Sequence, residues 1–501
     1  MVGLNHRAPR RWALVGLALF MVLLLARAGW ADTPTSGAAA ATLNLPSSVE
    51  TDTTQKIDTG DTAWMLISTA LVMVMMPGLA LFYAGMVRRK NVLGTMMHSM
   101  AVLGIIGLEW VIIGYAMAFG TSKGGFVGWD PKLLFLQGVE PSQLHKGTHI
   151  PELVFVMFQG MFAIITPALI SGAFAERVKF KSFCVFTLLW GVLIYNPLAH
   201  WVWGGGWLGT SGDGYHMGAL DFAGGTVVHI SAGVSALVMA IYLGKRIGYP
   251  ASVLQPNSLV LTFLGAGLLW FGWFGFNGGS ATASNGNAAG AFAATQIAAA
   301  AGAMGWMFAE WYKHGRPTTL GVASGLVAGL VAITPASGFV APWAAIVIGL
   351  AAGLVCYGAV LMKGKLGYDD SLDAFGVHGV GGFLGALLTG VFAAYAFSGK
   401  TPSGTEIHGM VEGNGHQVVT QLVAAVSAAV YAGVGTIVLV FVVDKLMGFR
   451  LRPTIEVEGL DVGVHGEQGW MLDATPMPSA EYPGNQSVDL PGRKREVAET
   501  H

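Results

Sequence analysis

The feature that most constrains this chain is a succession of long apolar stretches with few charged residues between them. Charged residues make up 11% of the 501 residues and hydrophobic residues 53%, whereas soluble domains carry about 25% charged residues. So little charge cannot cover a water-exposed surface of this size, so most of the surface must face lipid. The sequence therefore predicts an all-α polytopic membrane protein.

Eleven of these stretches are long enough to cross a hydrocarbon core of about 30 Å as helices. No soluble domain interrupts them before the C-terminal tail. We predict eleven transmembrane helices near residues 62–86, 93–119, 150–175, 180–198, 222–243, 255–276, 286–311, 318–334, 339–361, 375–397 and 416–446.

The N-terminus has the layout of a secretory signal peptide. Basic residues precede the apolar run 12–25, and Gly29-Trp30-Ala31 places small residues before a cleavage site after Ala31. The alternative is an uncleaved first span, for which this run is short. We expect four regions: the signal peptide 1–31, a periplasmic lead-in 32–60, the transmembrane domain 61–447 and a cytoplasmic tail 448–501.

Positive charge is distributed unevenly between the two sets of connections. With eleven spans, one set holds fifteen Lys and Arg residues and the opposite set holds five. Because Lys and Arg accumulate in cytoplasmic loops, the first set is expected to face the cytoplasm. The N-terminus then lies outside and the C-terminus inside, which agrees with an exported N-terminus.

Two distant segments share one pattern. Asp221 is followed by His229 after eight positions, and Asp370 is followed by His378 after the same interval. In both segments the histidine follows a valine and precedes a glycine by four positions.

A second match supports an internal repeat. The sequence Ile-Thr-Pro-Ala occurs at residues 165–168 and again at 333–336, in the third and eighth predicted spans. The matched helices lie five spans apart in both cases, an odd number, so they run in opposite directions. The pattern indicates an inverted-topology repeat of five plus five spans with an eleventh added.

The repeat predicts the depth of the two histidines. Eight residues at 1.5 Å each place each histidine about 12 Å from its own face, so the two approach the midplane from opposite sides. A single buried histidine could merely bridge helices, but a pair at matched depth favours a pathway. Asp221 and Asp370 are expected to cap their helices, and Asp221 could also favour a cation nearby.

Aromatic residues gather before the fifth span and at the end of the sixth. Such residues often form an interfacial belt. However, Trp203 lies in Trp-Gly-Gly-Gly and Phe276 in Gly-Phe-Asn-Gly-Gly-Ser, and the glycines let the backbone turn the rings inward. Because ring faces attract small cations, an aromatic vestibule for a cation is the alternative.

Several function classes lack support in the sequence. No zinc-protease or phosphate-loop motif is present, and no segment resembles a nucleotide-binding domain. Two midplane histidines lack the third ligand that a catalytic zinc needs. The net charge of −1 offers no basic field for nucleic acid. We therefore predict neither an enzyme nor a cofactor or metal site.

Four motifs resemble the bacterial ammonium transporter (Amt/Mep/Rh) family, over about residues 60–471. They are Gly-Ala-Leu-Asp-Phe-Ala-Gly-Gly-Thr-Val-Val-His (218–229), Gly-Trp-Phe-Gly-Phe-Asn-Gly-Gly-Ser (272–280), Phe-Gly-Val-His-Gly-Val (375–380) and Phe-Gln-Gly-Met-Phe-Ala (158–163). The resemblance implies a homotrimer in the bacterial inner membrane, with one pore through each subunit, that takes up ammonium.

The resemblance also implies roles for ten residues. They are the outer recruiting residues Trp203, Phe158 and Ser280, the acidic Asp221 beneath them, the pore-closing rings Phe162 and Phe276, the twin histidines His229 and His378, and the neighbouring pore positions Trp273 and Thr334. The tail motif at 458–467 resembles the segment that, with the inner loops, receives a PII signal protein of the nitrogen-status system. Segments 209–217 and 399–415 are longer than is common in the family, and 472–501 extends beyond its usual end.

The expected mechanism follows from selectivity. K⁺ and NH₄⁺ have similar sizes, but only ammonium can lose a proton and cross an apolar lumen as NH₃, where a retained charge costs several kcal/mol. We expect electrogenic uptake with the proton relayed through the histidines. Two alternatives stay open: an electroneutral NH₃/CO₂ gas channel of the Rh type, and an ammonium sensor.

Overall fold

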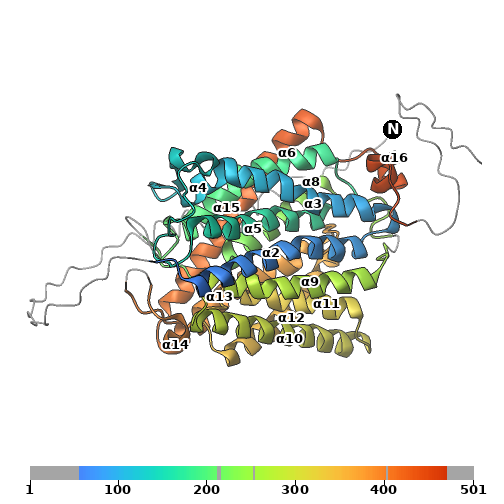
Figure 1. Cartoon of the computed structure of the whole chain (residues 1–501). Helices are drawn as coiled ribbons and strands as arrows, with labels where there is room; N and C mark the ends of the chain where they lie inside the picture. Colours follow the sequence, from blue (N-terminus) through green and yellow to red (C-terminus); the bar gives the residue numbers. More distant parts are fainter. Residues whose placement is uncertain (1–55, 211–215, 252–253, 402–403, 471–501) are drawn as a thin grey trace, which may run out of the picture.

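The computed structural model describes residues 56–210, 216–251, 254–401 and 404–470. Nearly all of the secondary structure is helical, and the long helices lie side by side in one bundle (Figure 1). The predicted signal peptide 1–31, most of the lead-in 32–60 and the extension 472–501 lie outside the described residues.

Ten described segments are long and apolar enough to cross a membrane. Several combine an α-helix with short 3₁₀ or π-helical segments (labelled η). Four of the ten are single helices: α2 (Thr59–Met86), α10 (Gly286–His314), α12 (Pro342–Leu366) and α15 (His416–Met447). Four more contain one α-helix and a short segment: Glu152–Phe174 contains α5 (Glu152–Ile170); Gly225–Leu243 contains η6 (Gly225–Ile230) and α8 (Ser231–Leu243); Leu259–Ala281 contains α9 (Leu259–Gly278); Phe375–Phe392 contains η8 (Phe375–Gly379) and α13 (Val380–Phe392). The last two contain two α-helices each: Arg89–Phe119 contains α3 (Val92–Glu109), η2 (Trp110–Gly114) and α4 (Tyr115–Phe119); Phe180–Val202 contains α6 (Phe180–Trp190), η5 (Gly191–Tyr195) and α7 (Asn196–Val202).

The predicted span 318–334 corresponds to a shorter helix, α11 (Thr319–Ile333). Thr318 caps its start, because the hydroxyl accepts a hydrogen bond from the Gly321 N–H. The helix ends just before Thr334-Pro335, where proline supplies no N–H to continue it. Almost every residue from Ala323 to Ile333 is buried, so α11 is enclosed by its neighbours.

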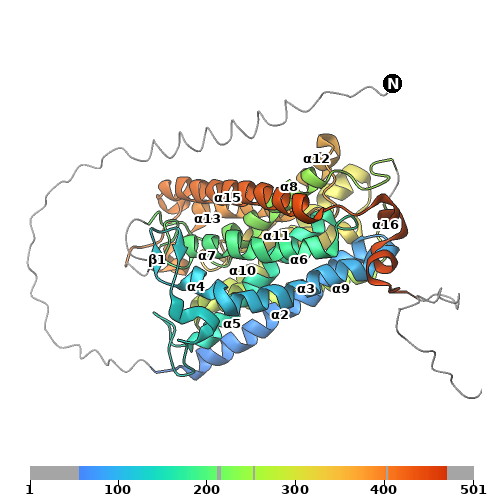
Figure 2. The ribbon, with the colours of Figure 1, turned by 90° about the horizontal axis from the view of Figure 1, so that it is seen from above.

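The two ends of the bundle differ. At one end, a short antiparallel pair, β1 (Ser122–Lys123) and β2 (Val127–Gly128), lies near α4 and α7. At the opposite end, α16 (Pro453–Glu458) and η10 (Asp461–His465) close the described chain (Figure 2). We call residues 448–470 the tail segment. It packs on the start of α3, where Asp461 accepts a hydrogen bond from the Gly94 N–H at 2.8 Å.

The two helices that carry the repeated Asp-to-His pattern cross at the centre of the bundle. Segment η6 packs against α13, and η8 packs against α8, as expected where helices run in opposite directions. The crossing is tight at the glycine that follows each histidine by four positions. A Cβ at Gly233 would lie 2.1 Å from the Gly379 nitrogen, and one at Gly382 would lie 2.9 Å from His229 Cβ.

Candidate functional site

Asp221 organises the start of the helix that carries His229. Its Oδ1 accepts hydrogen bonds from the N–H groups of Gly224 and Gly225, and its Oδ2 accepts two more from Thr226 and Val227, all at 2.6–3.1 Å. The predicted capping role is confirmed. Burial raises the pKa of Asp221 to about 6, although the four N–H groups oppose the shift.

Asp370 plays the matching part for His378. Its two oxygens accept hydrogen bonds from the N–H groups of Ala374 and Phe375 at 3.1 and 2.8 Å, so its predicted capping role is also confirmed. Burial raises its pKa to about 6 as well, although Lys363 opposes the shift. Both caps are followed at once by a π-helical turn that contains the histidine.

His229 and His378 meet at the helix crossing. Their Nδ1 atoms are 3.3 Å apart, and their rings are nearly parallel, with centroids at 5.3 Å and an angle of 24°. A hydrogen bond between two Nδ1 atoms needs one donor and one acceptor, so the pair shares a single Nδ1 proton. One imidazole then presents an acceptor Nε2 and the other a donor Nε2–H.

Trp273 stacks on His229 from one side. Its ring centroid is 5.5 Å from that of His229 at an angle of 25°. Its indole N–H donates to Thr334 Oγ1 at 2.9 Å, and the Thr334 hydroxyl donates in turn to the Leu330 carbonyl at 2.8 Å. Thr334 therefore fixes the orientation of Trp273, and it does not line the cavity described below.

Two phenylalanine rings stack above the histidines. The ring centroids of Phe162 and Phe276 are 4.0 Å apart with an angle of 18°, and Phe276 is 6.2 Å from the His229 ring. Both side chains are almost fully buried. The stack therefore lies between Trp203 and Phe158, whose rings are near that of Phe162, and His229, whose ring is near that of Phe276.

The three residues assigned to the outer site surround this stack. Trp203 meets Phe162 edge to face at 5.9 Å, and its indole N–H donates to the Asp221 carbonyl at 2.8 Å. The Phe158 ring is 5.0 Å from that of Phe162. The Ser280 hydroxyl donates to the Phe276 carbonyl at 2.8 Å, so its own oxygen keeps acceptor capacity.

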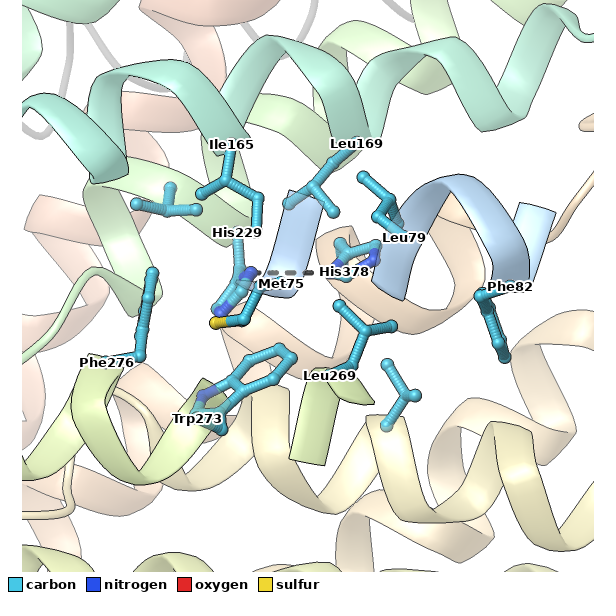
Figure 3. Close-up of a pocket in the computed structure, with 12 residues that line it drawn as sticks. Met75, Leu79, Phe82, Ile165, Leu169, His229, Leu269, Trp273, Phe276 and His378 are labelled. Atoms are coloured by element: carbon cyan, nitrogen blue, oxygen red, sulfur yellow. Dashed lines mark hydrogen bonds between the residues drawn. The ribbon is translucent and has the colours of Figure 1, made fainter. Parts of the chain in front are cut away.

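A narrow cavity adjoins the histidines (Figure 3). The space that the centre of a water-sized molecule can occupy is about 10 Å³, so the cavity has room for about one such molecule. In Figure 3, Phe276 and Phe82 stand at two ends with the histidines between them. Except for the imidazoles and the Trp273 indole the lining is apolar, and it consists of Met75, Leu79, Phe82, Ile165, Leu169, Val228, His229, Leu269, Trp273, Phe276, Val327 and His378.

The sequence motifs do not reveal most of these lining residues. Leu79, Leu169 and Val327 are ordinary apolar residues in apolar helices, so no local signal distinguishes them from lipid-facing neighbours. Only the meeting of several helices brings them together around one cavity.

Comparison with known proteins decides the family. A model described as the Ammonium Transporter Family matches residues 63–470. The chain belongs to the ammonium transporter family. The ammonium transporter of Bacillus subtilis (strain 168) is 48% identical over 414 residues, which cover 82% of this chain and 98% of that protein. The ammonium transporter of Aquifex aeolicus (strain VF5) is 46% identical over 432 residues, covering 86% and 98%.

Solved structures of the family share the fold. Mep2 of Candida albicans superposes with a TM-score of 0.73 at 34% identity, covering 79% of this chain and 87% of that chain. A structure titled Sensor Amt Protein gives a TM-score of 0.72 at 28% identity, covering 81% and 98%. Membership of this family identifies the chain as a multi-span membrane protein and supports ammonium transport as its activity.

Proposed function

We propose that this chain takes up ammonium by binding NH₄⁺ at an outer aromatic site, removing one proton and conducting NH₃ past His229 and His378. The observation that carries the proposal is the histidine pair, with Nδ1 atoms 3.3 Å apart, in an otherwise apolar cavity. Such a lining offers no replacement for the water around a cation, whereas a neutral molecule meets one donor and one acceptor nitrogen.

The outer site combines three kinds of attraction for a small cation. Trp203 and Phe158 supply ring faces, and Ser280 supplies one acceptor oxygen. Asp221 acts at a distance, because four backbone N–H groups already occupy its two oxygens. Its negative charge favours the cation, while its carbonyl holds the Trp203 indole in place.

The stacked rings of Phe162 and Phe276 form the gate between this site and the histidines. A side-chain movement must open the 4.0 Å stack before a molecule can pass. Because the lumen beneath is apolar, passage favours the deprotonated form, and K⁺ has no such form. The proton then crosses separately through the hydrogen-bonded imidazoles, which makes uptake electrogenic.

Several wider features belong to the same proposal. They are eleven transmembrane helices in an inverted repeat, an outside N-terminus and an inside C-terminus, assembly as a homotrimer with one pore per subunit, residence in the bacterial inner membrane, and reception of a PII signal protein at the tail segment. The fifteen-to-five distribution of Lys and Arg supports the orientation.

The test is an ammonium-pulse measurement on proteoliposomes, recorded as current on a solid-supported membrane. We expect a transient current in the unchanged protein and its loss, or entry of K⁺, in the double variant His229→Leu/His378→Leu. His314→Leu is the matched control, because this exposed histidine lies at the end of α10. Unchanged ammonium current together with unchanged K⁺ exclusion in the double variant would refute the proton relay.

The same measurement separates the two alternatives. Ammonia flux without current in the unchanged protein would support an electroneutral gas channel. A sensor role has one supporting observation, the 28% identity to the structure titled Sensor Amt Protein. Ammonium binding with neither current nor flux would favour that role.

A further inference from the structure

A carboxyl group outside the pore lies buried within a membrane-spanning segment. Glu109 is the last residue of α3, in the span Arg89–Phe119, and only 4% of it is exposed. An ionised carboxylate is rare and costly at such a place unless a cation or several donors accompany it. No cationic side chain pairs with Glu109 in the part of the chain that the structure describes.

The neighbour of Glu109 is an amide from another span. Asn196, the first residue of α7, donates from Nδ2 to Glu109 Oε1 at 2.7 Å. The second oxygen of the carboxyl group, Oε2, is buried without a partner, and so is the amide oxygen of Asn196. Two acceptors are therefore left unsatisfied on two groups that already bond to each other.

The backbone is shaped around this carboxyl group. A Cβ at Gly114 would lie 3.1 Å from both Glu109 oxygens, and one at Gly191 would lie 3.6 Å from Oε2. The π-helical segment η2 begins directly after Glu109, and η5 ends directly before Asn196. Such segments are rare and often mark functional positions.

We infer that Glu109 is a neutral carboxylic acid that forms a reciprocal pair with Asn196. The acid O–H on Oε2 donates to the Asn196 amide oxygen, while the Asn196 amide N–H donates to Oε1. One proton then supplies the donor that both unsatisfied acceptors lack, and it removes a buried charge from the membrane interior. The site binds a proton and stays apart from the histidine pair.

The pair acts on the pore as a positioning element. Asn196 begins α7, and Trp203 follows the last residue of that helix. Trp203 in turn donates its indole N–H to the Asp221 carbonyl. The neutral pair therefore fixes α3 to the helix that carries the outer aromatic residue, and its loss is expected to weaken ammonium recruitment.

Among the described residues, the titratable groups on the neighbouring elements η5 and α4 are tyrosines. Tyr195 on η5 is buried with an unpaired hydroxyl, and Tyr115 on α4 bonds to Glu152 of α5. None of these groups is a cation that would hold Glu109 ionised. Ionisation at alkaline pH would remove the hydrogen bond from the acid O–H to the Asn196 amide oxygen and leave only the bond from Asn196 Nδ2 between the two residues.

Infrared spectroscopy of the reconstituted protein tests the protonation state directly. At neutral pH we expect a carboxylic-acid carbonyl band that disappears in Glu109→Gln and shifts in Asn196→Leu. Loss of a carboxylate band in Glu109→Gln, with no change among the acid bands, would overturn the inference. This readout does not depend on transport, so it stands or falls separately from the proposed function.

Transport kinetics test the positioning role. Gln keeps both hydrogen bonds to Asn196, so Glu109→Gln is expected to retain the ammonium concentration for half-maximal current. Glu109→Leu removes the carboxyl partner of Asn196 and leaves its amide N–H groups only the Met117 sulfur at 4.0 Å, so it should raise that concentration about tenfold. An equal rise in the Gln and Leu variants would show that a charge is required and would overturn the neutral pair. No rise in either variant would overturn the positioning role.

Discussion

At the scale of single residues, the most informative side chain is Asp221. An ionised carboxylate has about four acceptor positions, and four backbone N–H groups fill them. The residue therefore cannot coordinate an ion without giving up part of the helix cap. Its charge and its cap act together, because the same hydrogen bonds that hold η6 in place keep the negative charge under the outer site.

Replacing Asp221 by Asn tests this double role. The amide keeps one oxygen, and its NH₂ group would face backbone N–H donors, so about two hydrogen bonds to a charged acceptor are lost at roughly 1.5–3 kcal/mol each. We expect a lower melting temperature and no ammonium current. Asp370→Asn is the matched control, since Asp370 accepts only two such bonds. A native melting temperature for Asp221→Asn would contradict the capping argument.

Residues with unusual chemistry in an apolar context could be predicted from the sequence, and apolar residues could not. The equal spacing from Asp221 to His229 and from Asp370 to His378 predicted two histidines at one depth, and the structure brings their rings together. Leu169 of the cavity gives no comparable signal. The roles of the candidate pore residues stay proposals.

At the scale of elements, the central feature is the crossing of η6–α8 with η8–α13. Each π-helical turn presents a histidine, and a glycine four residues later lets the partner helix approach. The distance between the two imidazoles therefore depends on backbone contact that no larger side chain permits.

Replacing Gly233 by Ala should separate the crossing helices. The new Cβ would lie 2.1 Å from the backbone nitrogen of Gly379, so a helix must shift, at about 1–3 kcal/mol or more. We expect a lower melting temperature and weaker ammonium current. The matched control is Gly267→Ala in α9, where nothing lies within 4 Å of the new Cβ. That variant should be neutral or stabilised by up to about 1 kcal/mol. Equal melting temperatures for the two variants would contradict the crossing argument.

Helix positions were predictable because hydropathy alone determines them, but helix ends were not. The predicted span 375–397 ends earlier, at Phe392, and a separate short helix, α14 (Tyr395–Ser398), follows. Local hydrogen bonds decide this end: the Ala393 carbonyl accepts from Gly409, and the Ala394 N–H donates to Phe339. Such partners come from distant parts of the chain, so sequence periodicity does not contain them.

At the scale of the whole molecule, a buried ion cluster joins the loops at the end that carries the tail segment. It consists of Arg88, Glu176, Arg177, Arg246 and Asp369, with ion-pair distances of 2.8–3.4 Å. These residues come from four loops far apart in the sequence. The charge bias of these loops predicted an orientation, but the acidic partners that bury the arginines became visible only in the fold.

Removing one acidic member should destabilise the whole bundle. Glu176→Gln removes a negative charge that neutralises Arg88 and Arg246 inside the protein. Breaking a buried ion pair in this way typically lowers the free energy of unfolding by about 3–5 kcal/mol. We expect a clear fall in melting temperature at neutral pH. The control Glu406→Gln removes exposed contacts with Lys400 at 3.6 Å and with His408 at 3.4 Å and should change stability by less than about 1 kcal/mol. A native melting temperature for Glu176→Gln would contradict the cluster's role.

The stability difference between the unchanged protein and Glu176→Gln should also depend on pH, which gives a second check on the same variant. Although burial raises the pKa of Glu176, the neighbouring Arg246 and Arg88 outweigh it and hold the pKa below the ordinary value of 4.5. An acid with a lowered folded-state pKa stabilises the fold fully above its unfolded value and loses that contribution as pH falls through the folded value. The stability gap between the unchanged protein and Glu176→Gln should therefore be constant near neutral pH and shrink only below about pH 4.5. A gap that already closes between pH 7 and pH 5 would show that another group, and not Glu176, controls the cluster.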